Sequence, residues 1–396
     1  MRLTAAARRQ VPFRSNVRPT SLMAPTGGWD AISPLADMPE DRAIQLDNWV
    51  PRTGFIEPRR GFIPWATGLG TSSQPVETIM AYNGVAAAND KLFGICDGEI
   101  WDITSTGAAV TTGVSGLLNN RWQYVNFTNA SGTHYLICCN GQDTPRIFDG
   151  STWATTTITG INQEDCIQPF VYQARIWFVR TVNGVMSPVY LGLDAISGAA
   201  TVFDLGKFLG QGGFIQAMGS WSVDTRQTVN DYLAFVSSTG QVIVYTGTDP
   251  GSASTWTLVG IYNIGRPIGR RCTTKIAGDL AIVNQDGVTS MNTMLLADRG
   301  TGKRESITNR ILNAMNDATQ AYGANFGWQF VPYYTDSLAI LNVPVTTNQE
   351  QQQYVMNILT GAWCRFISIN ANVWETFRDA IYFGGNDGIV YLWDYD

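Results

Sequence analysis

The chain has 396 residues, of which 44% are hydrophobic and only 15% are charged, against about 25% charged in an average soluble domain. Forty glycines, 13 tryptophans and few lysines argue against a helix-rich domain and favour β structure with many turns. We expect no membrane span, because no apolar run approaches the ~20 residues that a transmembrane helix needs. The N-terminal residues also lack the apolar stretch of a signal peptide.

Charge is distributed unevenly between the N-terminal segment and the rest of the chain. Residues 1–29 contain no acidic residue and five of the 26 basic ones, namely Arg2, Arg8, Arg9, Arg14 and Arg18. The remaining chain therefore has 21 basic and 32 acidic residues, a net charge of −11. An acidic body argues against binding nucleic acid through phosphate contacts, but it suits a surface past which nucleic acid slides without sticking.

The first 45 residues differ from the rest in their pattern. Residues 1–45 have weak periodicity, several prolines and a Gly27-Gly28 pair. This pattern predicts an extended N-terminal arm that becomes ordered only by lying on another surface. A disordered tail is the alternative, although apolar residues such as Phe13 and Trp29 are unusual in a solvated tail.

From residue 46 onward, short strand patterns recur in units of about 40–55 residues, with four strands in most units. A residue-Gly turn such as Asp97-Gly98 or Asp387-Gly388 recurs between the second and third strands. Repeats of this kind predict an all-β fold, a β-propeller of about seven four-stranded blades, with six or eight left open. The predicted units cover residues 76–112, 121–159, 166–206, 213–263, a fifth from 271, 326–369 and 372–396.

The last unit contains only three strands, which leaves an open sheet edge. The segment 46–65 precedes the first complete unit and has strand patterns but no blade of its own. We therefore predict that 46–65 supplies the missing strand and closes the ring, which divides the chain into an arm (1–45) and a propeller (46–396). The residues predicted to form this closure are Trp49, Phe55, Ile56, Phe62, Ile381, Phe383, Ile389, Tyr391 and Trp393.

The fifth unit is interrupted by a helical pattern at residues 303–320. Ile307, Ile311 and Met315 fall on one face at helical spacing. The pattern predicts a short helical insertion on one face of the ring. It either packs back on its own blade or forms a subunit contact or constriction.

No catalytic set is recognisable, so we predict a protein that is not an enzyme and that needs no cofactor or metal. The one histidine, His134, has no partner by motif, which argues against His-ligated metals and Ser-His-Asp hydrolysis. The six cysteines lack metal-ligand spacing and most lie in strand patterns, so we interpret them as reduced and buried. Partial matches to sialidase turns, at Phe148 to Trp153, and to WD repeats, at Trp101-Asp102, lack the other half of each motif.

Residues 24–62 contain four short motifs: Gly27-Gly28-Trp29-Asp30, Pro34 to Pro39, Leu46-Asp47-Asn48-Trp49 and Arg59-Arg60-Gly61-Phe62. Together they resemble the N-terminal region of bacteriophage virion proteins of the tail-nozzle type, also called packaged-DNA stabilisation proteins. The resemblance implies a propeller subunit in a ring, usually a homohexamer, at the distal end of a short tail. Such a ring mounts on a tail adaptor and forms the channel through which genomic DNA leaves.

The resemblance also implies partners and a location. It implies contacts with the adaptor and other tail or portal-complex proteins, DNA passage without sequence-specific binding, and a virion assembled in the host cytoplasm. We expect the arm to make assembly contacts, since arginine suits planar, multidentate interfaces. The arm residues assigned to assembly are Arg2, Arg8, Arg9, Arg14, Arg18 and Trp29. Two alternatives remain: a carbohydrate- or receptor-binding propeller that uses exposed aromatic rings, and a propeller glycosidase that uses paired carboxylates.

Overall fold

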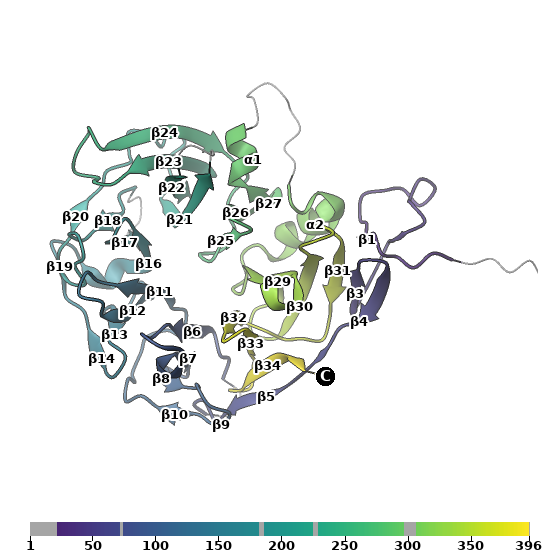
Figure 1. The fold of residues 1–396 in the computed structure, drawn as a ribbon, viewed down its shortest axis with the longest axis horizontal. Coiled ribbons are helices and arrows are strands. Elements are labelled where there is room, and N and C mark those ends of the chain that lie inside the picture. Colours follow the sequence, from purple (N-terminus) through teal and green to yellow (C-terminus); the bar gives the residue numbers. More distant parts are fainter. Residues whose placement is uncertain (1–21, 72–73, 182–185, 225–228, 297–305, 396) are drawn as a thin grey trace, which may run out of the picture.

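The computed structural model describes residues 22–71, 74–181, 186–224, 229–296 and 306–395. They form an all-β, seven-bladed propeller, and Figure 1 shows the blades arranged as a ring. The first strand of each blade lies next to the central axis, where it contacts the first strands of its neighbours. The predicted fold class is therefore confirmed, with seven as the blade count.

Five of the blades are four-stranded antiparallel sheets that use consecutive segments of the chain. Blade 1 contains β6 (Thr78–Tyr82), β7 (Lys91–Cys96), β8 (Glu99–Asp102) and β10 (Val110–Thr111). Blade 2 contains β11 (Gln123–Thr128), β12 (His134–Cys139), β13 (Arg146–Phe148) and β14 (Trp153–Thr155). Blade 3 contains β16 (Cys166–Tyr172), β17 (Arg175–Arg180), β18 (Val189–Tyr190) and β20 (Thr201–Val202). Blade 4 contains β21 (Ile215–Asp224), β22 (Val229–Ser237), β23 (Gln241–Gly247) and β24 (Trp256–Asn263), and blade 6 contains β28 (Gln329–Tyr333), β29 (Leu338–Thr346), β30 (Glu350–Asn357) and β31 (Trp363–Phe366).

The fifth blade has three strands: β25 (Thr273–Ile276), β26 (Asp279–Asn284) and β27 (Gly287–Ser290). Helix α1 (Met291–Leu296) follows β27 directly, and helix α2 (Leu312–Tyr322) comes after a short 3-10 turn, η3 (Asn309–Ile311). The helix thus begins and ends later than the predicted insertion at 303–320. It packs on β29 of blade 6 and on β27 of its own blade 5 through buried Ile311, Met315 and Ala318, so it contacts more than the single blade that the first alternative predicted.

Short elements fill the remaining connections. Small parallel pairs join β15 (Ile158–Thr159) to β19 (Gly198–Ala199), and β9 (Gly107–Ala108) to the edge of blade 7. Further 3-10 turns are η1 (Ala87–Asn89), η2 (Gln163–Asp165) and η4 (Tyr334–Asp336). None of the helices in the described ranges is long and apolar enough to cross a membrane.

Most of the core lies between neighbouring blades. One cluster joins blades 7 and 1 through Val373 and Ile79, and another joins blades 4 and 5 through Val236 and Ile282. At about 25 cal/mol per Å², burying a tryptophan ring of roughly 150–250 Å² contributes roughly 4–6 kcal/mol before entropy is counted. The fully buried tryptophans are Trp122, Trp177, Trp221, Trp363, Trp374 and Trp393. The six cysteines are also buried and unpaired.

Blade 7 closes the ring by combining both ends of the described chain. It contains β32 (Val373–Phe377), β33 (Ala380–Gly384) and β34 (Val390–Tyr395), and its fourth strand is β5 (Gly61–Thr67). Strand β5 runs antiparallel to β34, with Phe62 opposite Trp393 and Ile63 opposite Leu392. The predicted closure by an N-terminal strand is therefore confirmed.

The closing segment itself differs from the prediction of residues 46–65. The closing strand is 61–67, whereas Trp49, Phe55 and Ile56 belong to a separate hairpin, β3 (Trp49–Arg52) and β4 (Phe55–Pro58). This hairpin packs against β31 on the outside of blade 6. Of the other predicted closure residues, Ile381, Phe383, Tyr391 and Trp393 lie in blade 7, and Ile389 directly precedes β34.

The described part of the N-terminal arm is folded onto the ring. Strands β1 (Gly28–Trp29) and β2 (Arg42–Ala43) pair in parallel and lie outside β31 with the hairpin (Figure 1). Trp29 is 6% exposed, because its ring packs edge-on against Tyr354 at 5.1 Å and beneath the guanidinium of Arg365. The predicted assignment of Trp29 to a free assembly arm is therefore wrong. The predicted assembly residues Arg2, Arg8, Arg9, Arg14 and Arg18 lie outside the described residues.

Candidate functional site

Three cavities follow one another along the propeller axis. The middle one, of about 190 Å³, is lined by residues of the innermost strands, including Gln123, Gln168 and Glu375. It shares Glu375 with a 400 Å³ cavity between blades 5, 6 and 7, and Arg271 with a 630 Å³ cavity at the other side. The middle cavity has room for only a few water molecules. We call the axial region that these three cavities line the channel.

The centre of this channel holds a carboxyl group, a phenol and a guanidinium. Glu375 on β32 lies beside Tyr124 on β11 and in the field of Arg271, which precedes β25. Burial raises the pKa of Glu375 from 4.5 to about 7, although hydrogen bonds and Arg271 oppose that rise. A carboxyl group with this pKa can exchange its proton near neutral pH. Burial likewise lowers the pKa of Arg271 to about 10.

The 630 Å³ cavity has three arginines in its lining: Arg121, Arg270 and Arg271. The loop 323–328, which follows α2, also lines the cavity and brings Phe326 against two of these guanidinium groups. The centre of the Phe326 ring lies 4.2 Å from Arg121 Cζ and 5.2 Å from Arg271 Cζ. This loop lies after the predicted insertion at 303–320, so the subunit contact or constriction predicted for the insertion stays a prediction.

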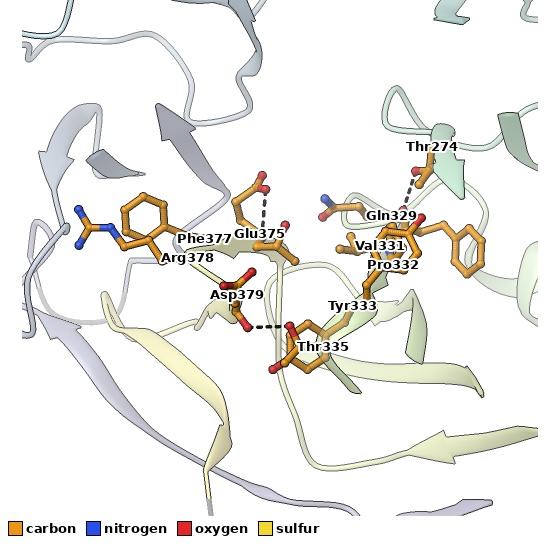
Figure 2. A pocket seen from close by; sticks show the side chains of 13 residues that line it. Thr274, Gln329, Val331, Pro332, Tyr333, Thr335, Glu375, Phe377, Arg378 and Asp379 are labelled. Atoms are coloured by element: carbon orange, nitrogen blue, oxygen red, sulfur yellow. Dashed lines mark hydrogen bonds between the residues drawn. The ribbon is translucent and has the colours of Figure 1, made fainter. Parts of the chain in front are cut away.

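The 400 Å³ cavity lies between the inner ends of blades 6 and 7 (Figure 2). Glu375 and Asp379 both line it, and Thr335 donates a hydrogen bond to the backbone oxygen of Asp379 at 2.9 Å. Arg378 points away from the cavity in Figure 2 and donates to the backbone oxygens of Ala87 and Asp90 in blade 1. This cavity contains acidic and hydroxyl groups but lacks the arginine cluster of the other side.

Side chains of the innermost strands also tie the blades together. At six of the seven blade junctions, a threonine or glutamine donates a hydrogen bond to a backbone oxygen at or just before the next blade's first strand. The donors are Thr78, Gln123, Gln168, Gln216, Thr274 and Gln329. Much of the polar lining of the channel is therefore structural.

A second candidate site is the segment outside blade 6, which we call the rim segment (residues 22–60). Its attachment uses residues of the motifs that carry the resemblance. Gly28 has φ +82°, and a Cβ atom there would lie 2.6 Å from the backbone oxygen of Trp363, so this position requires glycine. Asp47 accepts two hydrogen bonds from Arg365, both at 2.8 Å, while the side-chain oxygen of Asn48 accepts from Ile367 N and Arg59 Nε.

Asp30 stabilises the fold of the rim segment. Its buried carboxylate accepts from Ser33 and from the backbone nitrogens of Ile32 and Ser33, and it pairs with Arg42 at 2.7 Å. Burial raises the pKa of Asp30, but these hydrogen bonds together outweigh it and lower the pKa to about 2. The carboxylate therefore stays ionised and fixes the turn between β1 and β2.

Exposed apolar side chains concentrate on this side of the molecule. Seven of the 16 exposed large hydrophobic side chains in the described ranges fall within the rim segment. They are Leu22, Met23, Ile32, Leu35, Ile44, Trp49 and Phe55. Scattered exposed apolar residues are normal, but a concentration of them marks an interaction surface.

Sequence reasoning found the rim segment but missed the channel. Tyr124, Arg271 and Glu375 belong to no motif, and only the fold brings blades 2, 5 and 7 together. A signal was present, because glutamine or threonine recurs in the first strand of six units, where a buried strand would otherwise be apolar. The lone His134 has its ring nitrogen 3.0 Å from the backbone oxygen of Asn83, a structural contact between blades.

Comparison with known proteins identifies the fold alone. No protein-family model matches the chain, and no curated protein matches it in sequence. Among solved structures, it is similar to BBS1N in complex with ARL6DN, at 10% identity and a TM-score of 0.50, over 85% of this chain and 97% of that one. The WD40 β-propeller domain of Doa1 (12% identity, TM-score 0.47, 85% and 98% covered) is also similar. So is the Cps50 (Swd1) propeller domain of Myceliophteria thermophila (10% identity, TM-score 0.47, 86% and 100% covered).

Proposed function

We propose that the protein is a structural, non-enzymatic subunit of a bacteriophage tail, of the nozzle type, and that the rim segment joins copies into a ring. The observation that carries the proposal is the concentration of exposed apolar side chains on the rim segment. Burying such a surface between copies is favourable at about 25 cal/mol per Å² before the costs of association. The tail role itself comes from the resemblance of the rim motifs.

The contacts of the rim motifs support this reading. Gly28, Asp47 and Asn48 fix the segment to blade 6, which leaves its apolar residues facing outward. The basic segment 1–21 directly precedes the rim segment in the sequence, and the rest of the protein is acidic. Opposite charges on arm and body suit contacts between copies or with an adaptor.

In such a ring, DNA passes through the space that the subunits enclose. The cavity of about 190 Å³ on the axis of each propeller is too small for a nucleic acid strand. An acidic lining with few lysines would avoid holding the phosphates and so favours passage.

Labelling tests the tail role in the natural particle. Antibodies against the chain, imaged by electron microscopy on purified particles, are expected to mark the distal end of a short tail. Absence of the chain from purified particles would contradict the proposal.

A glycosidase is the second candidate, and one observation favours it. Glu375, with its raised pKa, and Asp379 line the same 400 Å³ cavity, which is within the size range of small-ligand sites. Hydrolysis of glycan substrates that is lost on Glu375→Gln and retained in Glu350→Gln would support it.

A further inference from the structure

We propose that the 630 Å³ cavity at the channel mouth binds a small ligand through an oxyanion, a carboxylate or phosphate group, held by Arg121, Arg270 and Arg271. This proposal is independent of the tail role. The cavity falls within the usual volume of small-molecule sites, about 300–1,000 Å³.

The charge of the lining is the first argument. Three arginines line the cavity, and no aspartate or glutamate does, although the whole chain has a net charge of −6. Glu77, the one carboxylate bonded to any of the three in the described residues, accepts from Arg121 Nε at 3.0 Å and also from Asn348. Glu77 is therefore the one hydrogen-bonded carboxylate for three positive charges, and both Glu77 and Glu375 act on Arg271 through their charge.

The hydrogen bonds of the two inner arginines are the second argument. Within the described part of the chain, Arg270 Nη1 donates to the backbone oxygens of Ile215 and Gln216. Arg271 Nη2 donates to Thr78 Oγ1 and to the backbone oxygens of Glu77 and Trp122. These neutral acceptors hold the side chains in place without cancelling their charge.

One donor is left without an acceptor. Arg271 Nη1 is buried and has no hydrogen-bond partner within the described residues. A buried unpaired donor on a charged group is energetically costly. An oxyanion in the cavity would offset the charge that this buried guanidinium carries, and arginine binds carboxylates and phosphates in a bidentate geometry.

Phe326 lies against two of the three guanidinium groups. Both Arg121 and Arg271 lie against the same ring, so like charges are held near one another by contacts with the ring face. Arg121 in turn helps to lower the pKa of Arg271, which is the effect of a neighbouring positive charge. A bound anion would relieve this repulsion, which favours its binding at this position.

Thermal unfolding and calorimetry of the full-length protein test the proposal, with inorganic phosphate and citrate as probes. Sodium chloride at the same ionic strength is the reference. We expect a saturable rise in melting temperature with at least one probe. The probe that causes the rise identifies the ligand group as a phosphate or a carboxylate. A rise no larger than that with chloride, for both probes, overturns the proposal.

Substitutions in the cavity lining test whether the ligand binds in this cavity. Arg121→Gln is expected to weaken binding about tenfold, since a charge-assisted hydrogen bond contributes about 1.5–3 kcal/mol. The matched control is Arg378→Gln, because Arg378 also packs on a phenylalanine, at 4.8 Å, but lines the other cavity. The exposed Gln142→Glu adds a negative charge to the lining without core changes and should weaken binding too. Equal affinity in the wild type, Arg121→Gln and Gln142→Glu would overturn the assignment.

Discussion

At the scale of single residues, Glu375 combines a structural position with a titration near neutral pH. Its carboxyl group faces the channel, where burial favours the protonated form. The unfolded chain, in contrast, ionises with an ordinary glutamate pKa of 4.5. Folding stability therefore depends on pH through this one side chain.

The sign of this dependence follows from the raised pKa. The contribution of Glu375 to the free energy of unfolding is fully present below pH 4.5. It falls as pH rises toward 7 and stays low above pH 7. We predict that Glu375→Gln removes this slope, so that the variant gains up to about 3 kcal/mol relative to the wild type between acidic and alkaline pH. Urea unfolding of both proteins from acidic to alkaline pH measures this difference in the free energy of unfolding. Parallel pH profiles would contradict the prediction, and exposed Glu350→Gln is the control.

In the rim segment, Asp47 is the residue whose carboxylate makes stability depend on pH. Hydrogen bonds from Arg365 lower the pKa of Asp47 below 3.8, so its stabilisation is present at neutral pH and is lost on acidification. We predict that Asp47→Asn loosens the rim segment by about 1–2 kcal/mol, because both hydrogen bonds are charge-assisted but partly exposed.

Hydrogen exchange measures this local effect. Peptides covering residues 42–52 should exchange faster in Asp47→Asn, because the amides of Asn48 and Arg365 bond across the same contact. Peptides of β22 should be unchanged. Exposed Asp37→Asn is the matched control, and equal exchange in both variants would refute the role of Asp47.

At the scale of elements, β5 closes the ring and the β3–β4 hairpin does not. Strand β5 pairs with β34 along its length, and Ala66 is fully buried between blades 7 and 1. The hairpin instead rests on blade 6, where Arg52 pairs with Asp336 at 2.6 Å. Closure and rim attachment are therefore separate functions of neighbouring segments.

A charge placed in the closing strand distinguishes these functions. We predict that Ala66→Asp destabilises the whole fold by about 3 kcal/mol or more, because it buries an unpaired carboxylate. Thr67→Asp, one residue further along the same strand, is exposed and should change stability by less than about 0.5 kcal/mol. Chemical unfolding measures both, and similar midpoints would contradict the closure.

The strands of the ring were predictable because alternation and turn chemistry are local signals. Asp97 and Gly98, for example, have φ values of 54° and 72°, the left-handed pair that a tight hairpin needs. The hairpin at 49–58 was misassigned because it packs on β31, which lies far away in the sequence. The neighbouring Asp47, for example, pairs with Arg365, 318 residues away. The channel residues were missed for the same reason, since contacts between distant blades leave no local pattern.

At the scale of the whole molecule, one side of the ring combines features of an assembly surface. The rim segment presents apolar side chains, and its attachment to blade 6 involves a charged pair, a required glycine and a buried tryptophan. A monomer gains little from holding such a segment against its surface with apolar residues facing water. A ring of copies would bury them.

Replacing outward-facing apolar residues of the rim segment is expected to block assembly without unfolding the propeller. The double variant Leu35→Asp and Ile44→Asp changes exposed side chains only, at 75% and 57% exposure. Its melting temperature should match the wild type. A matched pair of exposed residues far from the rim, Leu193→Asp and Val202→Asp in blade 3 and its connection, should leave assembly intact.

Electron microscopy of the purified full-length protein tests the central claim most directly. Class averages of the wild type and of the blade 3 control should show closed rings of several copies, with neighbouring propellers in contact through the rim segment. The double rim variant should show single propellers. Single propellers in all three samples, or rings that persist in the rim variant, would contradict the account.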